Sequence, residues 1–375
     1  MFLQIHTLTS YPASLLNRDD AGLAKRIQFG NATRQRVSSQ CLKRHWRETL
    51  QEELPEIPDG LRTRHFFSRV ILERVKETGM PEKQATEMVE TLASAVVKGG
   101  VKGIEMDQPV LFGAREADYF TQMISEAAKE YPDKMVESLK KRLSSKEEKK
   151  NLEAMKKAAG MTSALFGRMV TSDLLARVDA PVHVAHAITV HAANTEMDYF
   201  TVVDDLSRDE ETGAAHANQT ELGAGVYYGY VAVDIPLLVS NITGTDAGKW
   251  NEQDGDLARK IVGALVRAIA EKSPGAKKGS TAPYSRAETI LMEVGRQQPR
   301  QLCNAYLDAL PARGQLVQAA SLRLAEHMKK LDAMYGPTAD LRAVSTLYPE
   351  ADFGASPVPL NEATKQALDA IWSRA

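Results

Sequence analysis

Residues 17–47 read NRDDAGLAKRIQFGNATRQRVSSQCLKRHWR and join the first strand expected in this chain to its first helix. Eight Lys or Arg stand here against two Asp, whereas the whole chain has a formal charge of −2, so the other residues together carry −8. The total charge therefore offers no attraction for a polyanion. Any binding of nucleic acid must depend on this local basic cluster.

A helix is predicted directly after Ser38-Ser39, because serine is favoured at helix starts and apolar residues then recur at Leu42, Trp46, Leu50 and Leu54. The first turn of a helix leaves backbone N–H groups unpaired, and fixed donors beside cations suit a phosphodiester backbone. A solvated basic helix face is the alternative. The cationic edge of this helix consists of Lys43, Arg44 and Arg47.

The composition is that of an ordinary globular protein. With 375 residues, 43% hydrophobic and 26% charged, the chain can bury a sizeable core in one large domain or in two to three smaller ones. Cys41 and Cys303 lack the spacing of a metal site or redox motif, which favours a reducing compartment. Neither residues 1–9 nor any later stretch indicates secretion or membrane insertion. We therefore expect a cytoplasmic protein without membrane contact and without a cofactor.

The pattern of strands and helices predicts an α+β fold. A strand over residues 2–9 leads through the basic segment, interpreted as a long loop, into the first helix. Helical periodicity then indicates a helical insertion over residues 61–160. Further elements follow as a strand at 182–191, a strand at 224–235, a helix at 257–269 and a strand at 288–294.

Without the insertion, this order is βαββαβ, the arrangement of ferredoxin-like or RNA-recognition-motif domains with a four-stranded antiparallel sheet. This domain would comprise residues 1–60 and 161–375, with a hairpin tip over about 193–223. The usual aromatic RNA-binding signature is absent. Three aromatic residues on the third strand could replace it, but sheet packing is the better interpretation: Tyr227, Tyr228 and Tyr230.

Two kinds of catalysis are disfavoured by spacing. His183 and His186 are three apart on a predicted strand and point to opposite faces, so these two could not share a metal ion, and His191 is interpreted as structural. A G-x-S-x-G turn does not occur, so Ser38-Ser39 is better used as a helix cap than as a nucleophile. The sequence indicates no metal site.

Six motifs occur in order along the chain: NRDD (17–20), RVSSQCLKR (36–44), FGRM (166–169), AHAIT (185–189), DYFTVVDDL (198–206) and SPGAK (273–277). Through them, residues 1 to about 280 resemble the CasC family, the repeated backbone subunit of the type I-E CRISPR surveillance complex Cascade. The resemblance implies a modified RNA-recognition-motif palm, an inserted helical fingers domain and a protruding thumb.

The resemblance also implies a role without catalysis. Copies of the subunit would assemble head to tail along one CRISPR RNA, grip its backbone and present its bases to target DNA, so that the guide reads the sequence. Capping subunits at the crRNA ends, a large subunit and a small subunit would complete the complex. We interpret the following residues as RNA contacts on this basis: Asn17, Arg18, Arg36, Ser38, Gln40, Lys43, Arg44, Arg47, Arg168, Met169, Lys277 and Lys278. For Met169 the alternative is a core position, and for Lys277 and Lys278 a solvated loop.

The thumb cannot bind nucleic acid by charge, since residues 194–222 hold eight acids and one arginine. Its apolar stretch is suited to wedging between bases or to docking on the next subunit, or else it is a strand buried in this chain. This stretch contains Tyr199, Phe200, Thr201, Val202 and Val203.

Two further interpretations concern target nucleic acid. The resemblance suggests a DNA contact on the fingers, where a solvated helix is at least an equal alternative, at Lys140, Lys141 and Arg142. The competing function is a target-RNA endonuclease of a type III-like complex, in which Asp19 or Asp20 would position a metal or a 2′-hydroxyl. A loop with these two Asp paired to Arg18 is the simpler explanation.

Overall fold

The structure is a computed structural model that describes residues 1–97, 99–147, 151, 160–168, 177–203, 214–276 and 279–373, with the backbone alone for 200–203 and 214–218. The chain divides into two compact units. The first contains Met1–Glu53, His183–Asp234 and Arg259–Ala375, and the second contains Leu54–Val182 and Ile235–Ala258. The expected insertion, residues 61–160, lies within the second unit, which also includes chain segments on either side of it.

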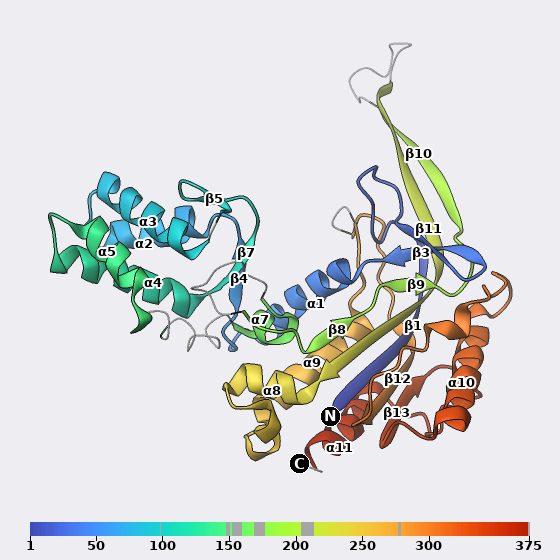
Figure 1. The fold of residues 1–375 in the computed structure, drawn as a ribbon. Helices are drawn as coiled ribbons and strands as arrows, with labels where there is room; N and C mark the ends of the chain where they lie inside the picture. The colour runs from blue at the N-terminus through green and yellow to red at the C-terminus, as the bar shows by residue number, and fades with distance from the viewer. Residues whose placement is uncertain are drawn as a thin grey trace. The chain divides into compact units, whose positions relative to one another are not determined.

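The first unit is built on an antiparallel sheet, so the predicted α+β class is confirmed (Figure 1). The sheet has the strand order β13-β12-β1-β11-β9-β3-β2, with β8 and β10 also paired to β11. Its central strands follow the order β12-β1-β11-β9. The strands are β1 Phe2–Ser14, β2 Arg26–Phe29, β3 Ala32–Val37, β8 Val182–Val184, β9 Ala187–Thr189, β10 Thr195–Val203, β11 Ala214–Asp234, β12 Ala287–Gly295 and β13 Leu341–Thr346.

Helices cover both faces of this sheet, and the side chains of β1 point alternately to one face and to the other. Ile5 and Thr7 point to one face, where they line a cavity of about 40 Å³ together with Leu42 and Trp46 of the first helix and Ile269 of α9. Leu8 points to the opposite face, into a core completed by α10. The helices of the unit are α1 Ser39–Glu53, α9 Asp256–Glu271, α10 Leu316–Tyr335 and α11 Leu360–Trp372, with the short 3-10 helix η5 Cys303–Tyr306.

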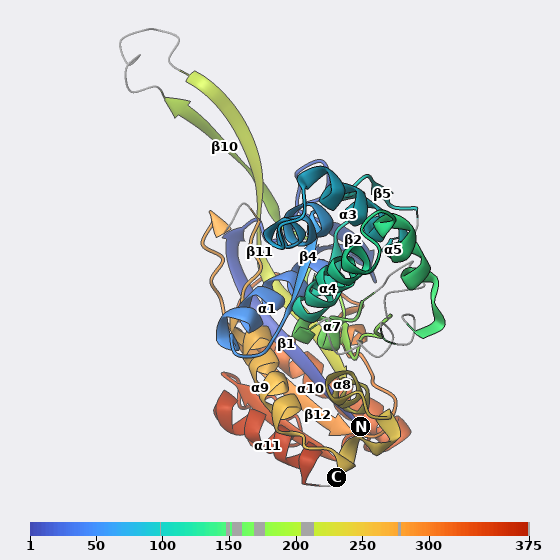
Figure 2. The same ribbon diagram turned by 90° about the vertical axis from the view of Figure 1, so that its left-hand side faces the viewer.

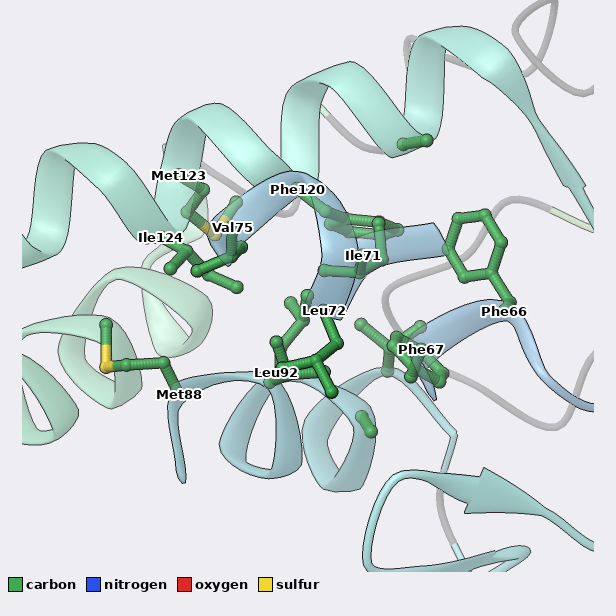
Figure 3. Packing of buried hydrophobic residues seen from close by; sticks show 14 of the residues in the cluster. Phe66, Phe67, Ile71, Leu72, Val75, Met88, Leu92, Phe120, Met123 and Ile124 are labelled. Atoms are coloured by element: carbon green, nitrogen blue, oxygen red, sulfur yellow. The ribbon is translucent and has the colours of Figure 1, made fainter. Parts of the chain in front are cut away.

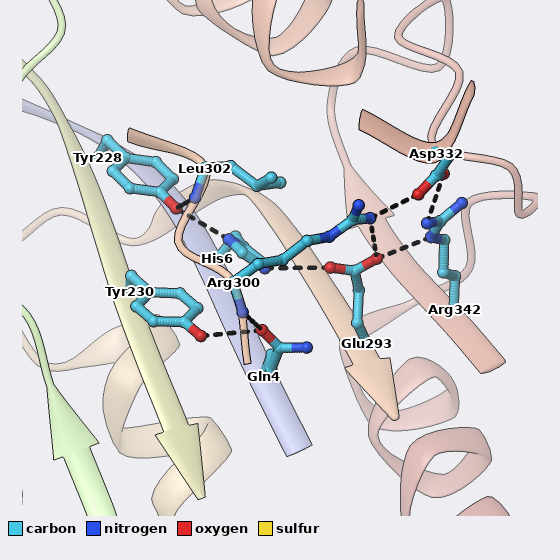
Figure 4. A network of polar contacts seen from close by, with 9 residues as sticks. All are labelled: Gln4, His6, Tyr228, Tyr230, Glu293, Arg300, Leu302, Asp332 and Arg342. Carbon is cyan, nitrogen blue, oxygen red and sulfur yellow. Dashed lines mark hydrogen bonds and ion pairs between the residues drawn. The ribbon is translucent and has the colours of Figure 1, made fainter. Parts of the chain in front are cut away.

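Polar side chains are buried on the α10 face, where Figure 4 shows them joined in one network. His6 and Glu293 are both fully buried, with Nε2 of the histidine 3.4 Å from the carboxylate. Arg300 and Arg342 each contact Glu293 and also Asp332. Because each charge meets an opposite charge, β1, β12, β13 and α10 are joined without leaving a net buried charge.

The basic segment is not the long loop that we expected, because it contains the β2–β3 hairpin. Gly30 and Asn31 form its two-residue turn, Gly30 has a φ of +59°, and Phe29 pairs with Ala32. A glycine at the first central position with φ above zero is the requirement of a tight hairpin turn. Charged residues on both strands concealed the alternation that normally identifies a strand.

The predicted hairpin with a long tip consists of β10 and β11, which leave the sheet together (Figure 1 and Figure 2). β11 is longer than predicted because its first half pairs with β10 and its second half with β1. Tyr227 and Tyr228 are buried, and the hydroxyl of Tyr230 donates to Oε1 of Gln4 at 2.8 Å. These tyrosines pack within the sheet, as their alternative interpretation predicted.

The second unit contains the predicted helices around a core of its own, shown in Figure 3. Phe66 stacks on Phe112 with ring centroids 3.9 Å apart, and Phe120 is fully buried beside them. Its helices are η1 Phe67–Ile71, α2 Leu72–Glu77, α3 Glu82–Val96, α4 Ala114–Glu130, α5 Met135–Ser144, α7 Gly160–Phe166, α8 Ile235–Thr243 and η3 Ala247–Glu252. Its strands are β4 Gly60–Thr63, β5 Val101–Lys102, β6 Glu105–Met106 and β7 Val110–Gly113. Across the described residues of both units, no helix is long and apolar enough to cross a membrane.

Candidate nucleic-acid interface

A groove of about 800 Å³ in the first unit brings together three segments that are distant in sequence. They are the end of β1 with the residues after it, the first turns of α1, and the loop between α9 and β12. The lining residues are Leu16, Asn17, Arg18, Ser38, Gln40, Cys41, Arg44, His45, Glu48, Lys272, Ser273, Gly275, Ala276, Gly279, Pro283 and Tyr284. Five predicted RNA contacts are therefore gathered at one site.

The start of α1 is held by side chains on either side of it. Ser38 caps the helix as predicted, because its Oγ accepts from the N–H of Cys41 at 3.3 Å. Asn17 Oδ1 accepts from the N–H of Ser38 at 2.9 Å, and His186 Nδ1 accepts from the N–H of Ser39 at 3.2 Å. Asn17 follows β1 and His186 directly precedes β9, so these two hydrogen bonds fix the helix start relative to both strands.

His186, which does not itself line the groove, lies near three cations. Burial lowers the pKa of this histidine, and the charges of Arg36, Lys25 and Lys43 lower it further. A neutral imidazole can accept the hydrogen bond from Ser39, whereas an imidazolium could not. The same three cations create a positive field at the helix start, where the helix dipole already favours an anion.

Two arginines bring positive charge to the groove itself. Arg18 is exposed, and Arg44 is exposed with an ion pair to Glu48, 2.9 Å from Nε to the carboxylate, one turn along the helix. Lys43 and Arg47 lie on α1 but do not line the groove, and Arg36 contacts His186 at 3.3 Å. Helix α1 thus has one cationic edge at the groove and a second beside His186.

Two other arginines of the basic cluster have structural roles. Arg34 is fully buried, and its guanidinium donates to the carbonyl oxygens of Thr189 at 3.2 Å and Tyr306 at 2.7 Å. Arg26 forms an ion pair with Glu221, which is almost fully buried on β11. These arginines stabilise the β2–β3 hairpin, so the basic cluster serves both folding and surface charge.

The loop after α9 forms the wall of the groove that faces Asn17. The N–H of Ala276 donates to the carbonyl oxygen of Leu15 at 2.9 Å, which ties the loop to the end of β1. The predicted contacts Lys277 and Lys278 lie outside the described residues, between Ala276 and Gly279 in sequence.

Arg168 lies in a buried ion pair. It is 3% exposed, and its Nη1 lies 2.7 and 2.8 Å from the two carboxylate oxygens of Glu116. A buried arginine paired with a carboxylate stabilises the second unit, and the contact of Arg168 with RNA stays a prediction. Met169, its partner in the FGRM motif, lies outside the described residues.

None of the predicted thumb and DNA-contact residues is among those that line the groove. Tyr199 on β10 is 60% exposed, whereas Phe200, Thr201, Val202 and Val203 are described by their backbone alone. On α5, Lys140 and Lys141 are exposed, but Arg142 is paired with Glu126 at 2.7 Å and with Glu130 at 2.9 Å. Arg142 therefore fits its alternative interpretation, a solvated helix face.

Asp19, considered for an RNA endonuclease, and His191, considered for a metal site, both make hydrogen bonds within the fold. The carboxylate of Asp19 accepts from the N–H groups of Ala21 and Leu23, both at 3.0 Å, and shapes the loop after β1. We had expected an ion pair with Arg18, and these two hydrogen bonds within the loop are found for Asp19 instead. His191 is buried and its Nε2 contacts the N–H of Val226 at 3.2 Å. Among the described residues, no group of three or more His, Cys, Asp or Glu is placed to hold a metal.

Several lining residues were missed by sequence reasoning, among them Cys41, His45, Lys272 and Tyr284. Cys41 lies three positions before Arg44 and His45 lies four positions after Cys41, so helical spacing could have identified both. Lys272 and Tyr284 flank a loop whose position depends on tertiary contacts, so no local signal pointed to them.

Two solved structures that are similar to this chain identify the class of protein. A solved chain described as "CRISPR RNA-guided surveillance complex, pre-nicking" matches with a TM-score of 0.77 and 26% identity, covering 98% of this chain and 100% of that chain. Another, described as "CRISPR RNA-guided surveillance complex", matches in fold with a TM-score of 0.63 and 22% identity, covering 99% and 100%. The structure is thus similar to subunits of such complexes.

The chain belongs to the CT1975-like Cas protein family, whose model matches residues 3–372. No curated protein sequence matches it significantly.

Proposed function

We propose that this protein is a backbone subunit of a CRISPR RNA-guided surveillance complex of type I-E, equivalent to CasC, and that it binds the sugar-phosphate backbone of the guide RNA. The observation that carries this proposal is the groove in which Asn17, Arg18, Ser38, Gln40 and Arg44 meet at the start of α1. Their donors suit phosphate and ribose groups, which are the same in every guide.

The strand order β12-β1-β11-β9 supports a palm related to the RNA-recognition motif, with the second unit as fingers and the β10–β11 hairpin as thumb. On β11, Tyr227 and Tyr228 are buried and Tyr230 is partly buried. Base stacking on the sheet face is therefore not the binding mode that we propose, and contact with the backbone at the helix start replaces it.

We further propose that copies of this protein associate head to tail along the RNA. Contacts of this type join two different surfaces and do not close, so the guide and the capping subunits would set the length of the filament. The exposed side chain of Tyr199 supports the hairpin as one of these surfaces. Target DNA, a large subunit and a small subunit are the other partners, in the prokaryotic cytoplasm.

Charge reversal in matched pairs tests RNA binding. Arg18→Glu with Arg44→Glu changes the groove edge of α1, and Lys43→Glu with Arg47→Glu changes its other edge. Filter binding of single-stranded RNA across salt concentrations should show weaker binding by both variants. The salt slope should also decrease, by about one for each phosphate that the variant no longer neutralises.

The control is Lys329→Glu with Lys330→Glu on α10, which reverses two exposed charges of the same unit. This control should leave the salt slope unchanged. Equal slopes in all variants would show that the basic cluster is an ordinary surface and would contradict the proposal.

We propose no catalytic role, because the carboxylate of Asp19 holds its own loop. The assembled complex can be incubated with RNA complementary to the guide and with Mg²⁺. Cleavage that Asp19→Ala or Asp20→Ala abolishes would establish the competing endonuclease function.

A further inference from the structure

The groove contains one tyrosine side chain that is largely open to solvent. Tyr284 is 80% exposed, more than any other large hydrophobic side chain among the described residues, and it lines the groove. A single exposed tyrosine is common on protein surfaces. This one differs because the backbone around it is constrained.

Two residues before Tyr284, the chain adopts an unfavourable conformation. Ala282 has a φ of +48° and is the one non-glycine residue with positive φ in the part of the chain that the structure describes. The N–H of Ala282 donates to the carbonyl oxygen of Gly279 at 2.8 Å, and that of Tyr284 donates to Ala282 at 2.8 Å. Such a conformation persists only where surrounding contacts impose it, and it is concentrated at functional sites.

The residue after Tyr284 is fixed from the other side of the loop. Ser273 Oγ donates to the carbonyl oxygen of Ser285 at 2.7 Å and accepts from its N–H at 2.9 Å. The tyrosine hydroxyl lies beside Gly279, where an added Cβ would approach it to 3.3 Å. The backbone at Tyr284 is therefore constrained on both sides, while the ring stays open to solvent.

We propose that Tyr284 is a stacking platform for an unpaired base of the single-stranded RNA held in this groove. This inference rests on the proposed function, since Arg18 and Arg44 would hold the phosphates while the ring supports a base. Every base has a π face, so stacking adds affinity without selecting a sequence. Because the backbone that carries the ring is already ordered, binding requires little ordering of the loop, which suits a guide of arbitrary sequence.

The test compares Tyr284→Ala with Tyr284→Phe in the full chain. The probes are single-stranded adenine and uridine RNA homopolymers measured across salt concentrations. The alanine variant should lose roughly 5- to 100-fold in affinity, more for adenine RNA, with an unchanged salt slope, because no phosphate contact is removed. The phenylalanine variant should bind like the wild-type protein. Circular dichroism checks that both variants are folded.

A second measurement locates the contact directly. RNA substituted with 5-iodouridine, irradiated in complex with the wild-type protein, should cross-link to the peptide that contains Tyr284. Wild-type affinity of the alanine variant, equal losses in both variants, or cross-links confined to other peptides would each overturn the stacking role.

The failure of this inference can be distinguished from failure of the proposed function. Salt-dependent RNA binding by the wild-type protein that Tyr284→Ala leaves intact would reject the platform and keep the backbone contact. Absence of salt-dependent binding by the wild-type protein would reject both.

Discussion

Nη1 of Arg168 lies 2.7 Å from Oε1 of Glu116, and the two side chains are only 1% and 2% exposed. The other carboxylate oxygen of Glu116 accepts from the N–H of Gly113 at 2.9 Å, at the start of α4. Arg168 is also joined to Val178 by two backbone hydrogen bonds. One buried carboxylate thus links the first turn of α4 to a distant part of the second unit.

Replacing this arginine should destabilise the protein. Arg168→Met leaves the charge of Glu116 buried without a partner, which typically lowers the free energy of unfolding by about 3–5 kcal/mol. Urea unfolding measures this change. The control is Arg177→Met, because Arg177 and Asp179 are both 72% exposed and such surface pairs contribute at most about 1 kcal/mol. Equal effects of the two substitutions would contradict the buried pair.

The buried network in Figure 4 should make stability depend on pH under acid conditions. Burial alone would raise the pKa of Glu293, but the hydrogen bond and charge of His6 with the charges of Arg300 and Arg342 lower this pKa to about 2. Since the folded-state pKa lies below the ordinary value of 4.5, the stabilisation is complete above about pH 4.5 and is lost as pH falls toward 2.

Protonation of Glu293 should lower the free energy of unfolding by an amount on the order of 3 kcal/mol. Urea unfolding between pH 2 and 6 should show a steeper decline in the wild-type protein than in Glu293→Gln. This variant should also be less stable at neutral pH, because two arginines lose a carboxylate partner. Parallel pH profiles would mean that other acids dominate acid unfolding.

The hairpin turn at Gly30 predicts a steric effect. A Cβ on Gly30 would lie 1.8 Å from the carbonyl oxygen of Leu307, in addition to the cost of a φ of +59°. Gly22 is a matched control, since its φ is +86° and nothing lies within 4 Å. Gly22→Ala should lower the free energy of unfolding by about 1–2 kcal/mol, because of the backbone conformation alone. Gly30→Ala should cost clearly more in thermal unfolding, and equal costs would contradict the close approach to Leu307.

The hairpin of β10 and β11 should affect assembly and not folding. Tyr199→Ala removes a ring that is 60% exposed, so the free energy of unfolding should change by less than about 0.5 kcal/mol. Native mass spectrometry with a guide-length RNA should show fewer copies bound per RNA if this ring contacts the next copy. The control is Tyr335→Ala on α10, a residue 69% exposed. The same copy number for wild-type and both variants would remove Tyr199 from the proposed interface.

Residues with regular spacing made much of the fold predictable. Leu42, Trp46 and Leu50 recur as on one face of a helix, and all three are buried in α1. Ser38 was recognisable as a cap because the hydrogen bond that it makes is local. The β2–β3 hairpin escaped notice because its interior positions hold Arg34 and Gln35, polar residues that are buried through hydrogen bonds to other strands.

By itself, the sequence determined the order of the elements with regular spacing and the gathering of positive charge before α1, because periodicity and capping act between near neighbours in the chain. The tertiary structure alone decided which charges line the groove and which have buried partners. Arg34 turns to buried carbonyl oxygens and Arg168 to a buried carboxylate, whereas Arg18 and Arg44 line a groove together with Tyr284. An arginine's partner depends on residues brought close by folding, often more than a hundred positions away, and no local pattern encodes that distance.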